Sequence, residues 1–293
     1  MRAAGMGIRE ELDKVMELQS DYSSLNTVAM RERGSIIKHV LPSLIGTHAE
    51  VLRSAADIAP DDFVLVGRDG IGRKSQVPWI RFASRARSPS AAVGWYVVWL
   101  FKEDGSGVYL ALSHASTKNV GGEFIKRPPD EARRLLAWGR DVLGPQLWED
   151  SRLSNEMMLG RGDLARSYES TTVASYLYAK EDLPPDSQMR DDMLSMAARL
   201  GKIYSQEPAQ NRTQETSLDV ISVMEVLDGI TSSRNLNGQG FALTHAQRRA
   251  VELRAMLLAK QHFVKEGFDV EDTSSSHPYD LIVTKIWIVG TLK

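Results

Sequence analysis

Cysteine is absent from all 293 residues of the sequence. Without cysteine the chain forms no disulfide, offers no thiolate ligand to zinc and has no cysteine nucleophile. Long apolar runs are absent too, since no stretch reaches the roughly 18 residues that a membrane-spanning helix needs. Glu10 and Glu11 stand where a secretory signal peptide would carry its apolar segment. We therefore expect a cytoplasmic protein with no membrane anchor.

An excess of positive charge is also lacking, because 36 lysines and arginines are opposed by 38 aspartates and glutamates, for a net charge of −2. This balance excludes a wholly basic nucleic-acid-binding protein, although local basic patches can still bind phosphate. The sequence contains no Walker A motif, no GxSxG nucleophile elbow and no HExxH metal motif. Any NTP-driven motor would therefore have to come from another chain.

Helical spacing dominates the first part of the chain. The apolar fraction of 42% and the charged fraction of 25% are typical of a folded globular protein. Apolar residues recur three and four apart from Ile8 to Leu18, and a second helical stretch from Ser35 to Ala56 is interrupted at Pro42. These patterns predict a helical N-terminal layer.

Strand patterns follow. Segments rich in β-branched and aromatic residues are separated by turn residues and lie at 63–66, 77–82, 94–101 and 107–113. Residues 103–107 join the last two segments as a hairpin. In the fourth segment Val108, Leu110 and Leu112 alternate with other residues, which predicts one buried face and one presented face.

Helical patterns return at 130–143 and at 188–204. The second helix carries an amphipathic stripe made of Met193, Met196, Ala197, Leu200 and Tyr204. The predicted fold class is therefore α+β, with the helical N-terminal layer, a mostly antiparallel β-sheet and packed helices.

The last third of the sequence changes in character. Polar stretches at 205–217 and 231–240 are typical of linkers, and a helix from Thr244 to Gly267 precedes short strand patterns at 268–271, 280–283 and 286–289. We expect a small α/β unit here. The predicted domains are a helical extension at 1–34, a recognition domain at 35–207, a linker at 208–243 and this C-terminal unit at 244–293.

A basic patch lies beside aromatic strands. Between residues 68 and 87 the single acid Asp69 accompanies six basic residues, namely Arg68, Arg73, Lys74, Arg81, Arg85 and Arg87. The adjoining strands carry Trp79, Trp95, Tyr96, Trp99 and Tyr109. Cationic loops next to flat aromatic surfaces are what a protein needs to hold a nucleic-acid base outside the stack. The alternative is that the aromatic residues form core and the loop is solvated, as in a protein-interaction module.

Four sequence blocks carry a family resemblance. The first three are VPWI at 77–80, GWYVVWLF at 94–101 and DGSGVYLAL at 104–112, and the fourth runs from Tyr168-Glu169 through LPPD at 183–186 to DDML at 191–194. In this order, over about half of the chain, they resemble the MrcB-like N-terminal domain family. The resemblance implies the DNA-binding specificity module of a modification-dependent restriction or defence system. Such a module flips a modified cytosine out of double-stranded DNA.

The resemblance also implies site residues. On the matching positions Trp79, Tyr96 and Leu100 form the pocket for the flipped base. The loop before Pro78-Trp79 lies near the duplex, and we expect its Ile71, Arg73 and Lys74, together with Arg81, to contact DNA. Where the best-understood relative has a tyrosine in this loop, the chain reads Ile71-Gly-Arg-Lys74. The residue that fills the gap in the duplex and the preferred modification therefore stay open.

The C-terminal unit resembles a second family. Segments RAVELRAM at 249–256, GFDVED at 267–272 and PYDL at 278–281 are similar to the start of the NO VEIN C-terminal domain, which is similar to PD-(D/E)xK nucleases. This resemblance implies a Mg²⁺ site with Asp280 as metal ligand and catalytic acid and with Glu252 contributed by the helix. The Glu-x-Lys half of the motif is missing, because the chain reads WIVGT at 287–291.

We therefore expect no nuclease activity from this chain alone and no cofactor except Mg²⁺ if another chain completes the site. The expected partners are modified double-stranded DNA and a separate nuclease or NTPase subunit. Two alternatives remain, a protein-interaction module of a defence complex and a Mg²⁺-dependent nuclease completed elsewhere. Steep weakening of binding by salt would favour DNA over an apolar protein interface.

Overall fold

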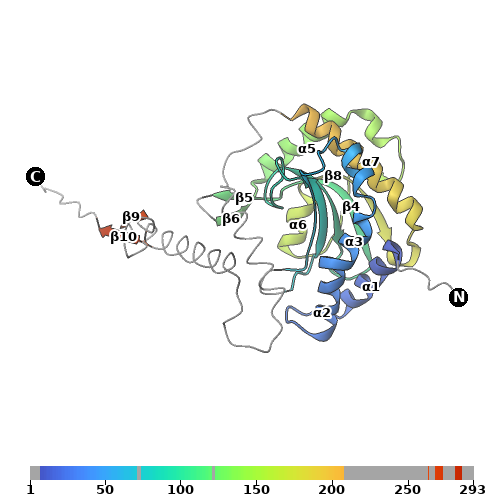
Figure 1. Cartoon of the computed structure of the whole chain (residues 1–293), viewed down its shortest axis with the longest axis horizontal. Coiled ribbons are helices and arrows are strands. Elements are labelled where there is room, and N and C mark those ends of the chain that lie inside the picture. Colours follow the sequence, from blue (N-terminus) through green and yellow to red (C-terminus); the bar gives the residue numbers. More distant parts are fainter. Residues whose placement is uncertain are drawn as a thin grey trace, which may run out of the picture. The chain divides into compact units, whose positions relative to one another are not determined.

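A computed structural model of the chain describes residues 7–70, 74–120, 123–207, 263, 268–272 and 281–285. The chain divides into two compact units, Met1–Glu215 and Thr216–Lys293 (Figure 1). The first unit confirms the expected α+β class, because it combines helices with an antiparallel sheet. The finer boundaries expected at residues 34, 207 and 243 stay predictions.

The N-terminal helical layer is present. Its elements are α1 (Ile8–Ser20), α2 (Val28–Ser35), the π-helical turn η1 (Ile36–Val40), α3 (Leu41–Gly46) and α4 (Ala49–Ala55). Pro42 stands in the first turn of α3, directly after the π-helical turn, and has no N–H to donate to that preceding turn. The expected interruption at Pro42 is therefore a change of helix type, from π to α, and not a gap.

A six-stranded sheet forms the centre of this unit, with strand order β1-β2-β3-β4-β8-β7 and antiparallel pairing throughout. Its strands are β1 (Phe63–Arg68), β2 (Trp79–Ser84), β3 (Trp95–Phe101), β4 (Gly107–His114), β7 (Leu153–Ser154) and β8 (Thr172–Ala179). The other elements are the hairpin β5 (Thr117–Val120) and β6 (Glu123–Lys126), helices α5 (Pro129–Leu143), α6 (Asp163–Glu169) and α7 (Asp186–Gln206), and the short turns η2 (Pro145–Trp148) and η3 (Lys180–Asp182). The hairpin between the third and fourth predicted strands is confirmed.

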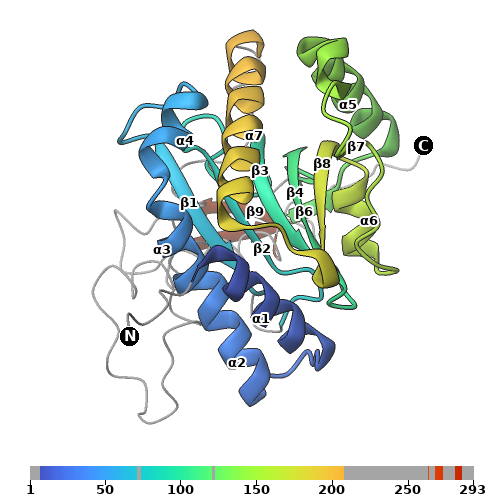
Figure 2. The same ribbon diagram turned by 90° about the vertical axis from the view of Figure 1, so that its right-hand side faces the viewer.

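Helices cover one face of the sheet. Val97 and Trp99 of β3 pack in one cluster with apolar residues of α1, α3 and α7. The predicted stripe on α7 is confirmed, since each of its residues is buried. Figure 2 shows α7 running across the strands, and in Figure 1 the strands lie between α6 on one side and α3 and α7 on the other.

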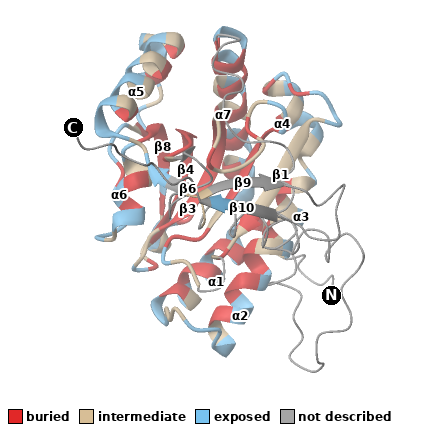
Figure 3. Ribbon diagram, turned by 90° about the vertical axis from the view of Figure 1, so that its left-hand side faces the viewer, coloured by how far each residue is buried: buried red, intermediate tan, exposed pale blue. Residues whose placement is uncertain are grey.

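The opposite face is buried as well. Tyr96, Val98 and Leu100 of β3 pack there against residues 157–165, which precede and begin α6. Every residue of β3 and β4 is buried (Figure 3). The expectation that one face of the 107–113 strand is presented to solvent is therefore wrong, because the segment around α6 covers Tyr109 and Ala111.

The N-terminal layer is tied to the start of α7. The carboxylate of Asp186, the first residue of α7, accepts hydrogen bonds from the backbone N–H groups of Ile8 at 3.1 Å and Arg9 at 2.8 Å. These N–H groups have no partner inside α1, so a carboxylate from another helix caps it. The first helix is thereby positioned by a residue 177 positions away.

In the second unit β9 (Phe268–Asp272) pairs antiparallel with β10 (Leu281–Lys285). The strands expected at 268–271 and 280–283 are confirmed apart from residue 280. The strand expected at 286–289, and the expected site residues Glu252 and Asp280, lie outside the described residues. Within the described part of the chain, no helix is long and apolar enough to cross a membrane.

Candidate base-binding recess

A recess opens on the α6 side of the sheet. It is lined by Trp79, Arg81, Ala91, Tyr96, Val98, Leu100, Ser113 and Tyr168. The free space between these side chains is small, with about 10 Å³ open to a water-sized molecule. The three pocket residues expected from the sequence, Trp79, Tyr96 and Leu100, therefore share one cavity with Arg81.

Strand register brings these side chains together. Trp79 of β2 pairs directly with Leu100 of β3, and Arg81 pairs with Val98. On the other side of β3, Tyr96 pairs with Ser113 of β4. Because alternate residues of a strand share a face, all of them project from the same side of the sheet. Three neighbouring strands thus form the floor of the recess.

The aromatic walls are neutral. Burial raises the pKa of Tyr96 well above its ordinary value, with the nearby hydroxyl of Tyr168 adding to the effect. Burial also raises the pKa of Tyr168 to about 12, although a hydrogen bond with Trp79 acts in the opposite direction. Both hydroxyls therefore remain protonated near neutral pH. The indole of Trp79 is held by the Tyr168 hydroxyl at the half-buried edge of the recess.

Arg81 is an internal cation of the recess. Its side chain is 1% exposed, and its Nη1 donates to the Ser88 carbonyl oxygen at 3.0 Å and to the Ser88 hydroxyl at 3.1 Å. The guanidinium lies 5.7 Å from the centre of the Tyr96 ring, within cation–π range. The Tyr96 hydroxyl in turn donates to the Ala91 carbonyl at 3.2 Å. Arg81 and Tyr96 together fix the loop between β2 and β3 over the recess.

Lys74 belongs to an internal ion-pair network. Its Nζ lies 2.6 Å from Oδ2 of Asp69, whose Oδ1 lies 2.5 Å from the guanidinium of Arg33. Arg33 and Asp69 are fully buried, and Arg33 also donates to the side chain of Gln19. Burial lowers the pKa of Arg33, whereas Asp69 opposes this change. Lys74 therefore connects the loop before Trp79 to α2, and its charge is balanced inside the protein.

The other described residues of the basic patch lie in different environments. Arg87 stacks 4.9 Å from the ring centre of Tyr204 and lies 3.9 Å from the carboxylate of Glu207. Arg85 is exposed on the loop after β2. The expected DNA-contacting residues Ile71 and Arg73 lie outside the described residues. The structure therefore separates a patch that was continuous in sequence into buried and surface cations.

The aromatic residues also divide between the two faces. Trp99 stacks on Tyr178 at 5.3 Å, and Trp95 contacts His114 edge-on at 4.8 Å, both in the core beneath the helices. For these two residues the alternative reading as core is confirmed. Tyr109 lies on the recess side, where its hydroxyl accepts from the backbone N–H of Met158 at 3.2 Å.

Sequence reasoning missed four residues that line the recess, one of which is Val98, between Tyr96 and Leu100 on β3. Tyr168 stood in the fourth family block but had no assigned role, and it arrives from α6, well separated from β2 along the chain. Ser113 could have been found from its alternation with Tyr109 and Ala111. Nothing in the sequence points to Ala91. Among the residues that the structure describes, no cluster of three histidine, aspartate or glutamate side chains could hold a metal ion.

The chain matches a known protein family. Residues 17–205 match the family described as MrcB-like, N-terminal domain. The matched region contains the whole six-stranded sheet and all eight residues that line the recess. No curated protein and no solved structure matches the chain.

Proposed function

Because the chain belongs to the MrcB-like N-terminal domain family, which indicates an McrB-like restriction or defence role, we propose that it reads a modified cytosine in double-stranded DNA. The base leaves the duplex and enters the recess between Trp79, Tyr96 and Leu100. The chain then acts as the specificity module of the system, and a separate nuclease or NTPase subunit is its partner. Asp280 and Glu252 take part in Mg²⁺ chemistry only if another chain completes their site.

The observation that carries this proposal is the convergence of Trp79, Tyr96 and Leu100, together with Tyr168, on one recess. Extruding a base costs a few kcal/mol, and stacking on an aromatic side chain returns about 1–3 kcal/mol per base. Trp79 is a half-buried aromatic residue of the recess, so part of its ring is open to an entering base. Its hydrogen bond to Tyr168 holds the indole in place before DNA binds.

The recess also suits recognition of a methyl group. Val98 and Leu100 present aliphatic surface, and a 5-methyl group on cytosine is read by apolar contact. A hydroxymethyl group needs a hydrogen-bond partner, because a buried hydroxyl without one costs about 1–3 kcal/mol. We therefore expect 5-methylcytosine to bind more tightly than 5-hydroxymethylcytosine, and both more tightly than cytosine.

Fluorescence anisotropy tests this function by measuring the affinity of the protein for three duplexes. The duplexes differ only at one cytosine, which is unmodified, 5-methylated or 5-hydroxymethylated. Trp79→Ala removes the stacking surface and should reduce the preference for the methylated duplex by about tenfold or more. Trp148→Ala is the matched control, because Trp148 is 40% exposed and lies outside the recess. It should keep the wild-type preference.

Equal binding of all three duplexes by the wild-type protein would contradict the proposal. A salt titration then distinguishes the alternative of a protein-interaction module. Binding to phosphate weakens steeply as salt rises, with a slope of about −0.9 per phosphate contact on logarithmic axes. Binding to an apolar protein surface does not follow this slope.

A further inference from the structure

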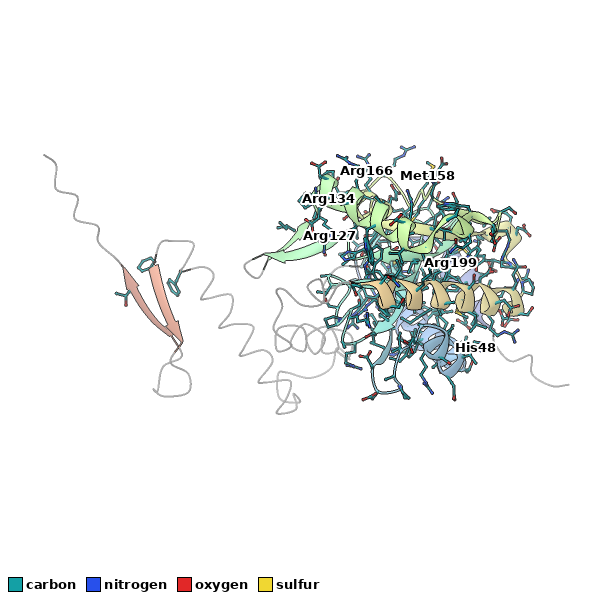
Figure 4. All side chains as sticks on the ribbon, turned by 90° about the horizontal axis from the view of Figure 1, so that it is seen from above. His48, Arg127, Arg134, Met158, Arg166 and Arg199 are labelled. Carbon is teal, nitrogen blue, oxygen red and sulfur yellow. The ribbon has the colours of Figure 1, made fainter. Side chains whose placement is uncertain are left out.

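Met158 is an outward-facing apolar side chain on the loop between β7 and α6. Its exposed fraction is 76%, whereas its neighbours Met157 and Leu159 are buried in the cluster that holds Tyr96 and Leu100. The loop thus directs one apolar side chain away from the protein and anchors the residues on both sides of it. Figure 4 shows Met158 at the periphery of the molecule, on the same side as Arg166.

Two hydrogen bonds place this loop at the border of the recess. The N–H of Met158 donates to the hydroxyl of Tyr109 at 3.2 Å, and Tyr109 is the cross-strand partner of Leu100. The N–H of Leu159 donates to Glu169 Oε1 at 2.7 Å, and Glu169 follows Tyr168 in α6. Both anchors are therefore immediate neighbours of residues that line the recess.

Glu103 holds the second half of the loop. Its carboxylate accepts from the N–H groups of Arg161 at 2.9 Å and Gly162 at 3.2 Å. Its own N–H donates to the carbonyl oxygen of Leu159 at 2.8 Å. The backbone on the C-terminal side of Met158 is thus fixed by several hydrogen bonds, and a fixed loop loses little conformational freedom when it binds.

Cations accompany Met158 on this segment. Arg161 and Arg166 are exposed, and no ion pair joins either of them to a carboxylate within the described ranges of the chain. Guanidinium groups in such positions suit phosphate oxygens, which set the position of a protein on a duplex. An exposed apolar side chain on the same segment as exposed cations has the chemistry of a surface that meets DNA, where stacked bases lie inside and phosphates outside.

We propose that Met158 enters the duplex and occupies the space that the flipped base leaves. This role rests on the base-flipping function proposed above. Methionine is one of the apolar side chains that proteins insert between base steps, and its unbranched thioether adapts to an irregular gap. Filling the gap favours the flipped state because the neighbouring bases keep an apolar surface to contact.

The test uses two duplexes with one 5-methylcytosine and a 2-aminopurine next to it, whose fluorescence rises when it unstacks. In one duplex the methylcytosine is paired with guanine, and in the other it faces an abasic site. Met158→Ala should weaken binding to the paired duplex about tenfold and should bind the abasic duplex as the wild-type protein does, since there extrusion costs less. Met158→Leu, and Val51→Ala on the exposed surface of α4, should match the wild type on both duplexes.

If Met158→Ala binds and unstacks both duplexes as the wild type does, the inserted role is overturned and base flipping stands. An equal loss on both duplexes also overturns it, because Met158 would then be an ordinary contact. If the wild-type protein prefers neither duplex over unmodified DNA and raises no fluorescence, base flipping itself fails and the inserted role fails with it. Thermal unfolding confirms that each variant is folded.

Discussion

At the scale of single residues, the buried His114 of β4 is expected to make the stability of the fold depend on pH. Burial lowers the pKa of His114 to about 4, and the nearby charge of Arg127 adds to this effect, whereas Glu131 and a hydrogen bond with the Ala115 carbonyl act in the opposite direction. The ring also contacts Trp95 edge-on. His114 is therefore neutral in the folded protein under conditions in which it would be protonated in the unfolded chain.

This difference predicts how stability depends on pH. Since the pKa of His114 is lower in the folded state than its ordinary value of 6.5, its contribution to stability is complete above pH 6.5. It is lost as the pH falls from 6.5 to about 4. The loss amounts to about 3 kcal/mol, at 1.36 kcal/mol per pKa unit.

Urea unfolding at pH 7 and pH 5 measures about 2 kcal/mol of this loss, because pH 5 lies above the folded-state pKa. His114→Gln cannot be protonated, so the variant should lose clearly less stability between the two pH values than the wild type. His48→Gln is the control, because His48 is half-exposed just before α4 and Figure 4 shows it far from Arg127, which neighbours His114. Equal pH dependence of the wild type and His114→Gln would contradict the assignment.

At the scale of elements, the ion-pair network of Arg33, Asp69 and Lys74 joins α2 to the loop that leads into β2. This loop directly precedes Trp79, so its position helps to set the edge of the recess. The N-terminal layer is therefore part of the structure that supports the candidate site. Gln19 of α1 extends the connection, because its amide donates to the carbonyl oxygens of Gln76 at 2.9 Å and Glu103 at 3.0 Å.

Asp69→Asn should destabilise the protein by about 3–5 kcal/mol, because it leaves the buried guanidinium of Arg33 without its carboxylate. Lys74→Met should cost much less, since it leaves the Arg33–Asp69 pair intact and the Lys74 side chain is partly exposed. Chemical unfolding followed by circular dichroism compares the two variants. If both variants lower the free energy of unfolding by the same amount, the pair formed by Arg33 and Asp69 is not the main source of stability in this network.

At the scale of the whole molecule, the first unit contains the sheet, the recess and both apolar clusters. The family match ends at residue 205, ten residues before the end of this unit. We therefore predict that a chain ending at Glu207 folds and keeps the preference for methylated DNA. Binding by this shortened chain, measured with the same three duplexes, should agree with that of the full chain within about threefold, or 0.7 kcal/mol.

A shortened chain that unfolds, or that binds DNA without distinguishing the methyl group, would show that residues after 207 complete the recognition unit. If the shortened chain is folded but does not discriminate, residues after 207 would have to supply part of the base-reading surface. Circular dichroism of the shortened chain separates these two outcomes.

Local patterns in the sequence were enough to predict α1, strands β1 to β4, helices α5 and α7 and one set of site residues, but not strands β5 to β8 or helix α6. The periods of strands and helices are local properties, so the strands at 79–84, 95–101 and 107–114 and the buried stripe of α7 follow from them. The family blocks identified Trp79, Tyr96 and Leu100, and strand pairing then explains why these three meet. Their role in DNA binding stays a prediction.

Only the tertiary structure decided which of these surfaces are accessible and which charges are balanced. A sequence shows that Lys74 is basic, but its partners Asp69 and Arg33 depend on how α2 packs beside the loop. Alternation shows that Tyr109 and Val108 face opposite ways, but not that the segment around α6 covers one side. Tyr168 joins the recess for the same reason. Contacts between distant segments depend on how loops close and how elements pack, and neither is contained in a local pattern.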